Sequence, residues 1–256
     1  HTRRKKRSIH DANRRLSDPW TDLIIQEVNL LPKGVKYRYL KEQLLAKFVS
    51  KDTDSPELRR SRAIEKWLAT EQRNKETNAR LANYSGEYNI LPRVSWERFL
   101  NVARAMVVDI IGETLPTEAL IGSFSGGAST SRSRTESHPA SKYIGRADIT
   151  PAAMVWWDAI STHIHGWDLS ALTINNVPGN VLFTVPKNTT IDRVAAKEPD
   201  LNMFMQKGVG LYIRRRLKQV GIDLNDQNRN KFLAQRGSLD GTLATMDLSS
   251  ASDSVT

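Results

Sequence analysis

The sequence contains no cysteine among its 256 residues. Disulfide bonds, thiolate zinc sites and a cysteine nucleophile are therefore excluded, and a reducing cytosol suits this composition. Long apolar runs are also missing, since the longest, residues 105–112, is too short to cross a bilayer and contains Asp109. No apolar stretch follows the basic residues 1–7, so a secretion signal is unsupported. The chain starts with His1 instead of methionine, and we expect a fragment of a longer protein.

Two familiar motifs are incomplete. Residues 122–146 are rich in glycine, serine and basic residues, which predicts a loop that could contact an RNA backbone. A phosphate loop of the Walker type needs lysine after its last glycine, but Ala128 follows Gly127. His163 and His165 lack a cysteine or a well-spaced carboxylate to complete a zinc site. Neither feature therefore predicts a mononucleotide loop or a histidine metal centre.

Positive charge is abundant. The chain has 38 lysine and arginine residues against 28 aspartate and glutamate residues, a net charge of +10. Such a balance favours a polyanionic partner such as nucleic acid, although a basic surface without a specific partner remains possible. With 39% hydrophobic and 26% charged residues, the composition is typical of a globular protein with one large domain or two smaller ones.

Residues 17–112 are predicted to be largely helical. Helices are expected to begin at Pro19 and Pro56, because each proline follows a capping side chain. The charged residues 59–80 are expected on a solvated helix face. Two apolar stripes with helical spacing are expected to pack in the core. Their members are Tyr37, Leu40, Leu44, Leu45 and Phe48 in the first, and Trp96, Phe99, Leu100, Ala103, Val107, Ile110 and Ile111, between a Ser95 cap and Gly112, in the second.

The second half of the chain mixes helices and strands, so the fold class is predicted to be α+β. A helix begins at Thr150-Pro151, and residues 179–199 are predicted to form two strands around a turn at Asn188. A long helix from Asp200 to Val220 and a shorter helix that ends at Gly237 are expected to follow. Residues 242–246 then read as a strand.

Two carboxylates lie at the end of this last predicted strand. Asp247 follows it directly and Asp253 comes six residues later, after a serine-rich turn. Carboxylate oxygens on a rigid strand are suitable ligands for the magnesium ions of nucleotidyl transfer, and Asp253 could accept a hydrogen bond from a ribose hydroxyl. Alternatively, Asp247 merely ends a strand and Asp253 caps a helix.

A basic cluster forms the second candidate site. Lys187, Arg193 and Lys197 lie in the predicted strand-turn-strand segment, and the last two share one face of a strand. Such cations could bind a triphosphate and stabilise the charge that develops on its leaving group. Exposed strand cations that prevent edge pairing are an equally good interpretation without further context.

Four segments together resemble the β subunit of levivirus RNA replicases. They are VLFTVPKN, IDRVAAKEPDLNMFMQKGVG, YIRRRLKQVGIDLNDQ and GSLDGTLATMDLSSASDS, with a fainter upstream match in FSGGAST. The resemblance implies a right-hand RNA-directed RNA polymerase that uses Mg²⁺ and ribonucleoside triphosphates on an RNA template. It further implies host translation factors as partners and the cytoplasm of an infected bacterium as the location.

The resemblance also assigns regions and residues. Residues 1–16 are expected to be a basic flexible terminus, residues 17–240 mostly helical fingers with a nucleotide-facing segment at 181–199, and residues 241–256 the start of the palm. Asp247 matches the metal-binding aspartate of motif A, and Asp253 matches the second aspartate of that motif. The triphosphate-facing residues correspond to Lys187, Arg193 and Lys197.

One element of such a polymerase is missing. The chain contains no glycine-aspartate-aspartate triplet, which the family uses to complete its metal ligands. We therefore expect the 256 residues alone to be inactive. The rival hypothesis is a non-catalytic basic RNA-binding module, in which the cations bind phosphates and the aspartates are structural.

Overall fold

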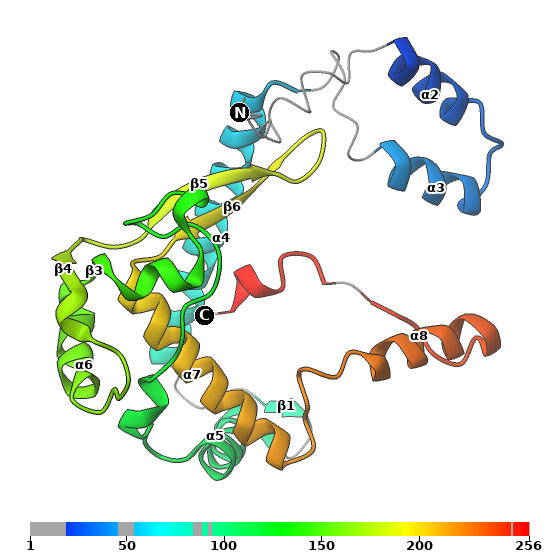
Figure 1. The fold of residues 1–256 in the computed structure, drawn as a ribbon. Helices are drawn as coiled ribbons and strands as arrows, with labels where there is room; N and C mark the ends of the chain where they lie inside the picture. Colours follow the sequence, from blue (N-terminus) through cyan, green and yellow to red (C-terminus); the bar gives the residue numbers. More distant parts are fainter. Residues whose placement is uncertain (1–18, 46–53, 84–88, 92–93, 247, 256) are drawn as a thin grey trace, which may run out of the picture. The chain divides into compact units, whose positions relative to one another are not determined.

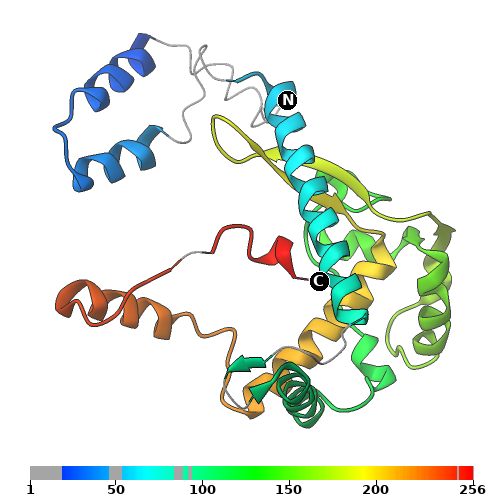
Figure 2. The same cartoon turned by 180° about the vertical axis from the view of Figure 1, so that it is seen from behind.

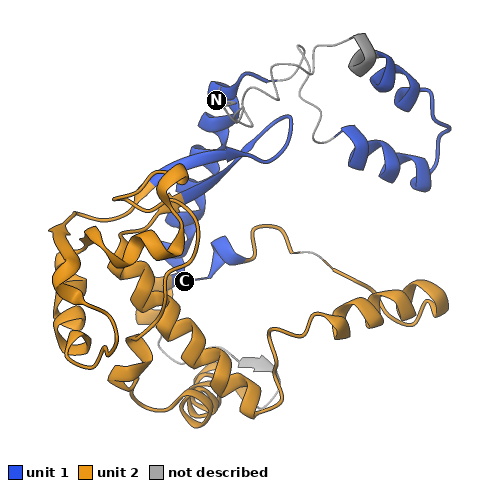
Figure 3. Cartoon of the chain, in the orientation of Figure 1, with its two compact units in different colours: residues 1–77, 182–195, 252–256 blue, residues 78–181, 196–251 orange. Residues whose placement is uncertain are grey.

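A computed structural model describes residues 19–45, 54–83, 89–91, 94–246 and 248–255. The chain divides into two compact units (Figure 3). Unit 1 comprises residues 1–77, 182–195 and 252–256, and unit 2 comprises residues 78–181 and 196–251. The predicted flexible terminus, residues 1–16, lies outside the described residues.

The described elements confirm the α+β character (Figure 1). The helices are α2 (Pro19–Asn29), α3 (Val35–Leu45), α4 (Pro56–Ala82), α5 (Trp96–Ile111), α6 (Pro151–Ser161), α7 (Asp200–Gln219) and α8 (Asn228–Asp240). The strands are β1 (Asn89–Leu91), β2 (Val94–Ser95), β3 (Gly145–Ile149), β4 (Leu172–Asn176), β5 (Val181–Pro186) and β6 (Asp192–Lys197). Short 3₁₀ helices include η1 (Thr117–Leu120), η3 (Pro139–Tyr143) and η5 (Ser252–Ser254).

Local capping chemistry explains the helix boundaries. The Ser55 hydroxyl accepts a hydrogen bond from the Leu58 backbone N–H at 3.2 Å, and Ser95 accepts one from Arg98 N–H at the same distance. These bonds satisfy backbone donors that a first helical turn leaves unpaired. Helix α5 ends at Gly112, whose φ of 102° favours glycine. The helix starts predicted at Pro19 and Pro56 and the helix end predicted at Gly112 are therefore confirmed.

The two apolar stripes were predicted wrongly as core. Helix α3 has no buried residue, and Leu40 is 42% exposed. Helix α5 also has none, although Trp96 and Phe99 stack with ring centroids 5.4 Å apart. Phe48 lies outside the described residues. Helical spacing creates an apolar face, but burial needs a second element against all of that face. Helix α2 contacts α3 and helix α7 contacts α5, yet neither contact buries a residue of the stripe.

The core of unit 2 is a βαβ arrangement. Strands β3 and β4 pair in parallel, from Gly145 opposite Leu172 to Ile149 opposite Asn176, and α6 forms the crossover between them. Helix α7 packs against β3, η1 and α6. The buried apolar side chains at this junction are Phe124, Ala147, Ile149, Trp157, Ile160, Leu201, Phe204 and Met205.

Two glycines let α7 approach the chain around η1 at backbone distance. A Cβ atom on Gly208 would lie 2.6 Å from the Ala119 carbonyl oxygen, and one on Gly122 would lie 2.0 Å from the Phe204 carbonyl oxygen. Both distances are too short for any side chain larger than hydrogen. Helix α7 also covers the end of α5, because Tyr212 Oη and Arg216 Nε donate to the Ile111 and Ile110 carbonyls at 2.7 and 2.6 Å.

A buried ionic cluster joins three segments of unit 2. The Asp200 carboxylate accepts hydrogen bonds from Ser129 Oγ at 2.6 Å and from the Asp148 backbone N–H at 3.1 Å. Lys142 is completely buried, and its Nζ donates to the Ser125 and Gly127 carbonyls, each at 2.9 Å. Every charge in this cluster is thus hydrogen-bonded, as burial requires.

The surroundings of these groups shift their pKa values. Burial lowers the pKa of Lys142, although the nearby Asp200 carboxylate opposes this effect. Burial alone would raise the pKa of Asp148, but hydrogen bonds from Arg146 and Asn175 and the Arg146 charge lower it below the ordinary carboxyl value. Asp148 therefore stays ionised in the folded protein at neutral pH.

The predicted end of the chain needs two corrections. Helix α8 continues through Gly237 and ends at Gly241, which has the left-handed φ of 69°. Gly237 serves packing instead, since a Cβ there would lie 2.4 Å from the Leu243 carbonyl oxygen. Residues 242–246 are not a strand but an exposed segment without regular secondary structure, and no described strand pairs with them. No helix among the described residues is long and apolar enough to cross a membrane.

We predict that Gly208→Ala destabilises the protein by about 1–3 kcal/mol, since the new methyl group forces α7 away from Ala119 and Leu120. Gly210→Ala is the matched control in the same helix, because a Cβ there meets nothing within 4 Å. It should be neutral or stabilising by up to about 1 kcal/mol through helix propensity. Urea denaturation of both variants checks this, and equal stabilities would contradict the close backbone contact.

We also predict that Asp148 contributes to acid unfolding. Its folded pKa lies below the ordinary 3.8, so its ionised form stabilises the fold above that pH and the contribution is lost as pH falls toward the folded pKa. Asp148→Asn should therefore flatten the decline of unfolding free energy below about pH 4. Urea titrations between neutral and acidic pH measure this slope. Asp158→Asn, at an exposed position of α6, is the matched control for the removal of one carboxylate.

Candidate functional site

The basic segment folds as a β-hairpin. Strands β5 and β6 pair in a two-stranded sheet, as predicted, and residues 187–191 connect them. Asn188 organises the turn, because its Oδ1 accepts hydrogen bonds from the backbone N–H groups of Thr190 and Ile191 at 3.0 and 2.9 Å. Such a side-chain-to-backbone turn is the ordinary reason for asparagine at this position. The sequence therefore identified both the strands and the turn residue.

Helix α4 holds this hairpin within unit 1, and the two lie side by side in both views (Figures 1 and 2). Arg59 is 4% exposed, and its Nε lies 3.4 Å from Asp192 Oδ1 at the start of β6. The same guanidinium donates to the Asp54 carbonyl at 2.5 Å. Arg62 donates to the Thr190 carbonyl at 3.1 Å and also pairs with the Asp54 carboxylate. The hairpin end is thus fixed by two arginines from one helix.

The three predicted nucleotide-binding cations occupy different positions on the hairpin. Lys187 is exposed one residue beyond β5, and Arg193 is exposed as the second residue of β6, so both lie at the end that α4 anchors. Lys197 is the half-buried last residue of β6 and belongs to unit 2. Arg193 and Lys197 do share one strand, as predicted. Exposed cations on an anchored hairpin can attract a polyphosphate without first ordering the backbone that carries them.

The structure describes one of the two candidate aspartates. Asp247 lies outside the described residues. Asp253 is exposed in the short helix η5, and its backbone carbonyl accepts a hydrogen bond from Asn74 Nδ2 of α4 at 2.8 Å. Its carboxylate accepts a hydrogen bond from Ser252 Oγ at 3.5 Å. The role of both residues stays a prediction.

No group of three histidine, cysteine or acidic side chains among the described residues could hold a metal ion. His163 Nδ1 instead lies 3.1 Å from the Ala159 carbonyl at the end of α6. Asp247 lies outside the residues to which this statement applies, so it remains a candidate ligand. Hard carboxylate oxygen is the donor that a magnesium ion prefers.

Several residues of the site escaped the sequence reasoning. The charged residues 59–80 were expected on a solvated face, which holds for most of α4 but not for Arg59. Lys142, in the loop at 122–146 that could contact RNA, is turned inward instead. Their partners lie far away in sequence, 133 residues for Arg59 and Asp192, so no local pattern could have identified them.

Comparison with known proteins gives the family. The profile described as "RNA replicase, beta-chain" matches residues 16–256. The RNA-directed RNA polymerase beta chain of Escherichia phage MS2 is 40% identical over 229 residues, covering 85% of this chain and 40% of the relative. The corresponding protein of Enterobacteria phage fr is 42% identical over 229 residues, and this match also covers 85% of this chain and 40% of the relative. The RNA-directed RNA polymerase subunit beta of Escherichia virus Qbeta is 37% identical over 232 residues, which cover 88% of this chain and 37% of the relative.

The chain thus spans about two-fifths of the length of these relatives. Its match nevertheless extends over both compact units, including the hairpin and the segment that carries Asp247 and Asp253. A match of this extent is far more specific than any single motif, and it confirms the resemblance stated from the sequence. The chain belongs to the RNA replicase β-chain family.

Proposed function

We propose that the protein carrying this chain is an RNA-directed RNA polymerase that replicates viral RNA by adding ribonucleotides to an RNA 3′ end. The observation that carries this proposal is the identity of about 40% with phage proteins named RNA-directed RNA polymerase, over 85% of the chain. The net charge of +10 is consistent with an RNA ligand. The proposal covers the complete gene product, since the 256 residues contain no glycine-aspartate-aspartate triplet and are expected to be inactive alone.

Each candidate residue has a role in this proposal. Asp247 holds Mg²⁺, which supplies Lewis-acid stabilisation of the reacting phosphate when bound. Lys187, Arg193 and Lys197 bind the triphosphate of the incoming nucleotide and stabilise negative charge on the departing pyrophosphate. Asp253 accepts a hydrogen bond from the ribose, which distinguishes ribonucleotides from deoxyribonucleotides. Arg59 and Arg62 anchor the hairpin at the end that carries Lys187 and Arg193, and this supports the role of the hairpin in binding the triphosphate.

The architecture and the setting are also proposals. In a right-hand polymerase, residues 17–240 are the fingers, with residues 181–199 facing the nucleotide, and residues 241–256 begin the palm. The exposed, unpaired segment 242–246 suits a palm strand whose neighbours lie elsewhere in the protein. Host translation factors are the proposed partners and the cytoplasm of an infected bacterium is the proposed location. Both of these rest on the family resemblance alone.

We predict that Asp247→Asn abolishes RNA synthesis while RNA binding is kept. The gene product extended to its natural stop codon should extend a primer on an RNA template with Mg²⁺ and labelled nucleotides. Loss of a metal ligand should reduce the rate on the order of a thousandfold or more. Asp226→Asn is the control, because the Asp226 side chain only accepts a hydrogen bond from Asn228 N–H, which an amide oxygen can also do. RNA binding without any extension by the wild-type protein would favour the non-catalytic binding module.

The hairpin cations generate a separate prediction. Lys187→Ala and Arg193→Ala should each raise the KM for ribonucleoside triphosphates about tenfold, the effect of one charge-assisted hydrogen bond. The affinity for template RNA should change little. Lys66→Ala, an exposed lysine of α4, is the matched control. Steady-state kinetics with varied nucleotide concentration measure this, and unchanged KM values in both hairpin variants would support the alternative of cations that only protect a strand edge.

A further inference from the structure

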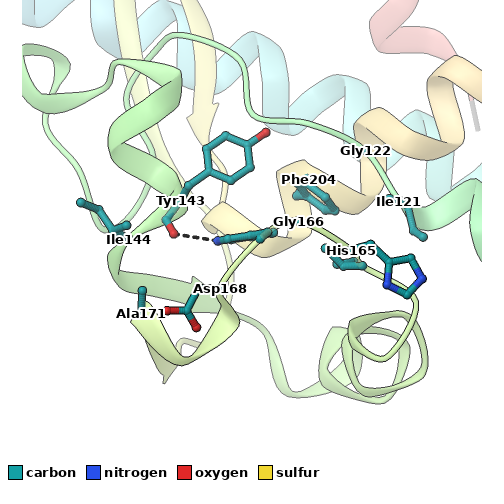
Figure 4. A pocket seen from close by; sticks show the side chains of 11 residues that line it. Ile121, Gly122, Tyr143, Ile144, His165, Gly166, Asp168, Ala171 and Phe204 are labelled. Atoms are coloured by element: carbon teal, nitrogen blue, oxygen red, sulfur yellow. Dashed lines mark hydrogen bonds between the residues drawn. The ribbon is translucent and has the colours of Figure 1, made fainter.

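Unit 2 contains an open pocket that none of the roles above uses (Figure 4). Its volume is about 570 Å³, within the range of small-ligand sites. It lies where the loop after α6 meets η3 and the first turns of α7. Aromatic and aliphatic side chains supply most of its wall, among them Tyr143, Ile144, Ile164, Trp167 and Phe204.

The aromatic wall is rigid. Trp167 Nε1 donates to the Tyr143 carbonyl at 2.7 Å, the dashed line in Figure 4. The two rings meet edge to face with centroids 4.9 Å apart, and the Phe204 ring lies 5.5 Å from Trp167. Phe204 and its neighbour Phe124 are buried in the core of unit 2. The wall is therefore preorganised, and a flat ligand would not have to order it.

Polar groups in the pocket suit a ligand with hydrogen-bond donors and no net negative charge. Asp168 lines one side, near Ala171, and His165 lies on the opposite side (Figure 4). Asp168 Oδ1 caps the Ser170 N–H and hydroxyl, at 3.0 and 2.6 Å. Its Oδ2 accepts no hydrogen bond from the described residues and can accept one from a ligand. A carboxylate in the wall disfavours a phosphate inside the pocket, since like charges would repel.

A cation lies beside the rim. Ile144, 61% exposed, forms the rim, and Arg132 Nη2 donates to its carbonyl at 2.5 Å and to the Arg146 carbonyl at 3.1 Å. Aromatic side chains in the wall and a guanidinium beside the rim are the groups by which single-stranded nucleic acids are bound, with a base stacked and its phosphate near a cation. We propose that this pocket binds one unpaired base of single-stranded RNA.

The carboxylate gives the pocket a preference among bases. Guanine, adenine and cytosine carry exocyclic amino groups that can donate to Asp168 Oδ2, whereas the one ring donor of uracil, N3–H, is flanked by two carbonyl oxygens that the carboxylate would repel. The pocket should therefore bind the first three bases more tightly than uracil. The choice of RNA as the ligand rests on the proposed polymerase function, but binding at the pocket can be measured without catalysis.

The test measures binding of fluorescently labelled RNA hexamers to the full-length protein by anisotropy. The probes are rG6, rA6, rC6, rU6 and an abasic hexamer with the same phosphates. Ile144→Glu places a charge at the rim and should weaken binding of rG6, rA6 and rC6 about fivefold to a hundredfold, the range of one stacked base. The affinity for the abasic hexamer should fall much less. Val155→Glu, at a 70% exposed position of α6 outside the pocket, is the matched control and should bind like wild type.

Asp168→Asn is the second variant, because its amide oxygen can still cap Ser170 while the charge is removed. It should reduce the preference for rG6, rA6 and rC6 over rU6 without unfolding the loop. If Ile144→Glu binds every hexamer as the control does, or weakens the abasic hexamer equally, the proposal is overturned. Primer extension by Ile144→Glu separates this result from the polymerase proposal, since failure of the pocket leaves synthesis at Asp247 intact.

Discussion

The carboxylate of Asp200 is the interaction on which the order of unit 2 depends. It stands at the first turn of α7, where a negative charge is favoured by the unpaired backbone donors of the helix, and it is completely buried. One oxygen accepts from Ser129 of the loop and the other from the backbone of β3. A buried charge is tolerated only with such partners, and the carboxylate and its two partners come from three separate segments. The helix, the loop and the strand are therefore fixed together.

Several other features depend on the position of α7. Its residue Gly208 contacts the backbone around η1, its Phe204 supports the aromatic wall of the pocket, and its Tyr212 pairs with the end of α5. The chain reaches α7 directly from β6 through Glu198 and Pro199. The proposed triphosphate-binding hairpin thus leads straight into the helix that organises unit 2. In unit 1 the same hairpin is held by Arg59, so its two ends have independent supports.

The charged side chains that stabilise unit 2 are different from the cations that are candidates for ligand binding. Hydrogen bonds within the fold occupy the buried charges of Lys142, Asp148 and Asp200. In contrast, Lys187 and Arg193 are exposed. In the proposed polymerase, Lys187 and Arg193 would bind and release a triphosphate at every cycle, which requires that they stay accessible to it. The division of cations into buried and exposed groups is consistent with that requirement, and charge counting alone could not have revealed it.

The sequence by itself determined the features that depend on neighbours along the chain. Ser55, Ser95 and Gly112 set helix ends through bonds within four residues, Asn188 set the hairpin turn, and the compound motifs around Asp247 identified the family. Only the tertiary structure decided which charges are buried, that no residue of α3 or α5 is buried, and that residues 242–246 form no strand with the described residues. Burial and strand pairing require a partner surface. Such a partner comes from a distant part of the polypeptide, which no local pattern specifies.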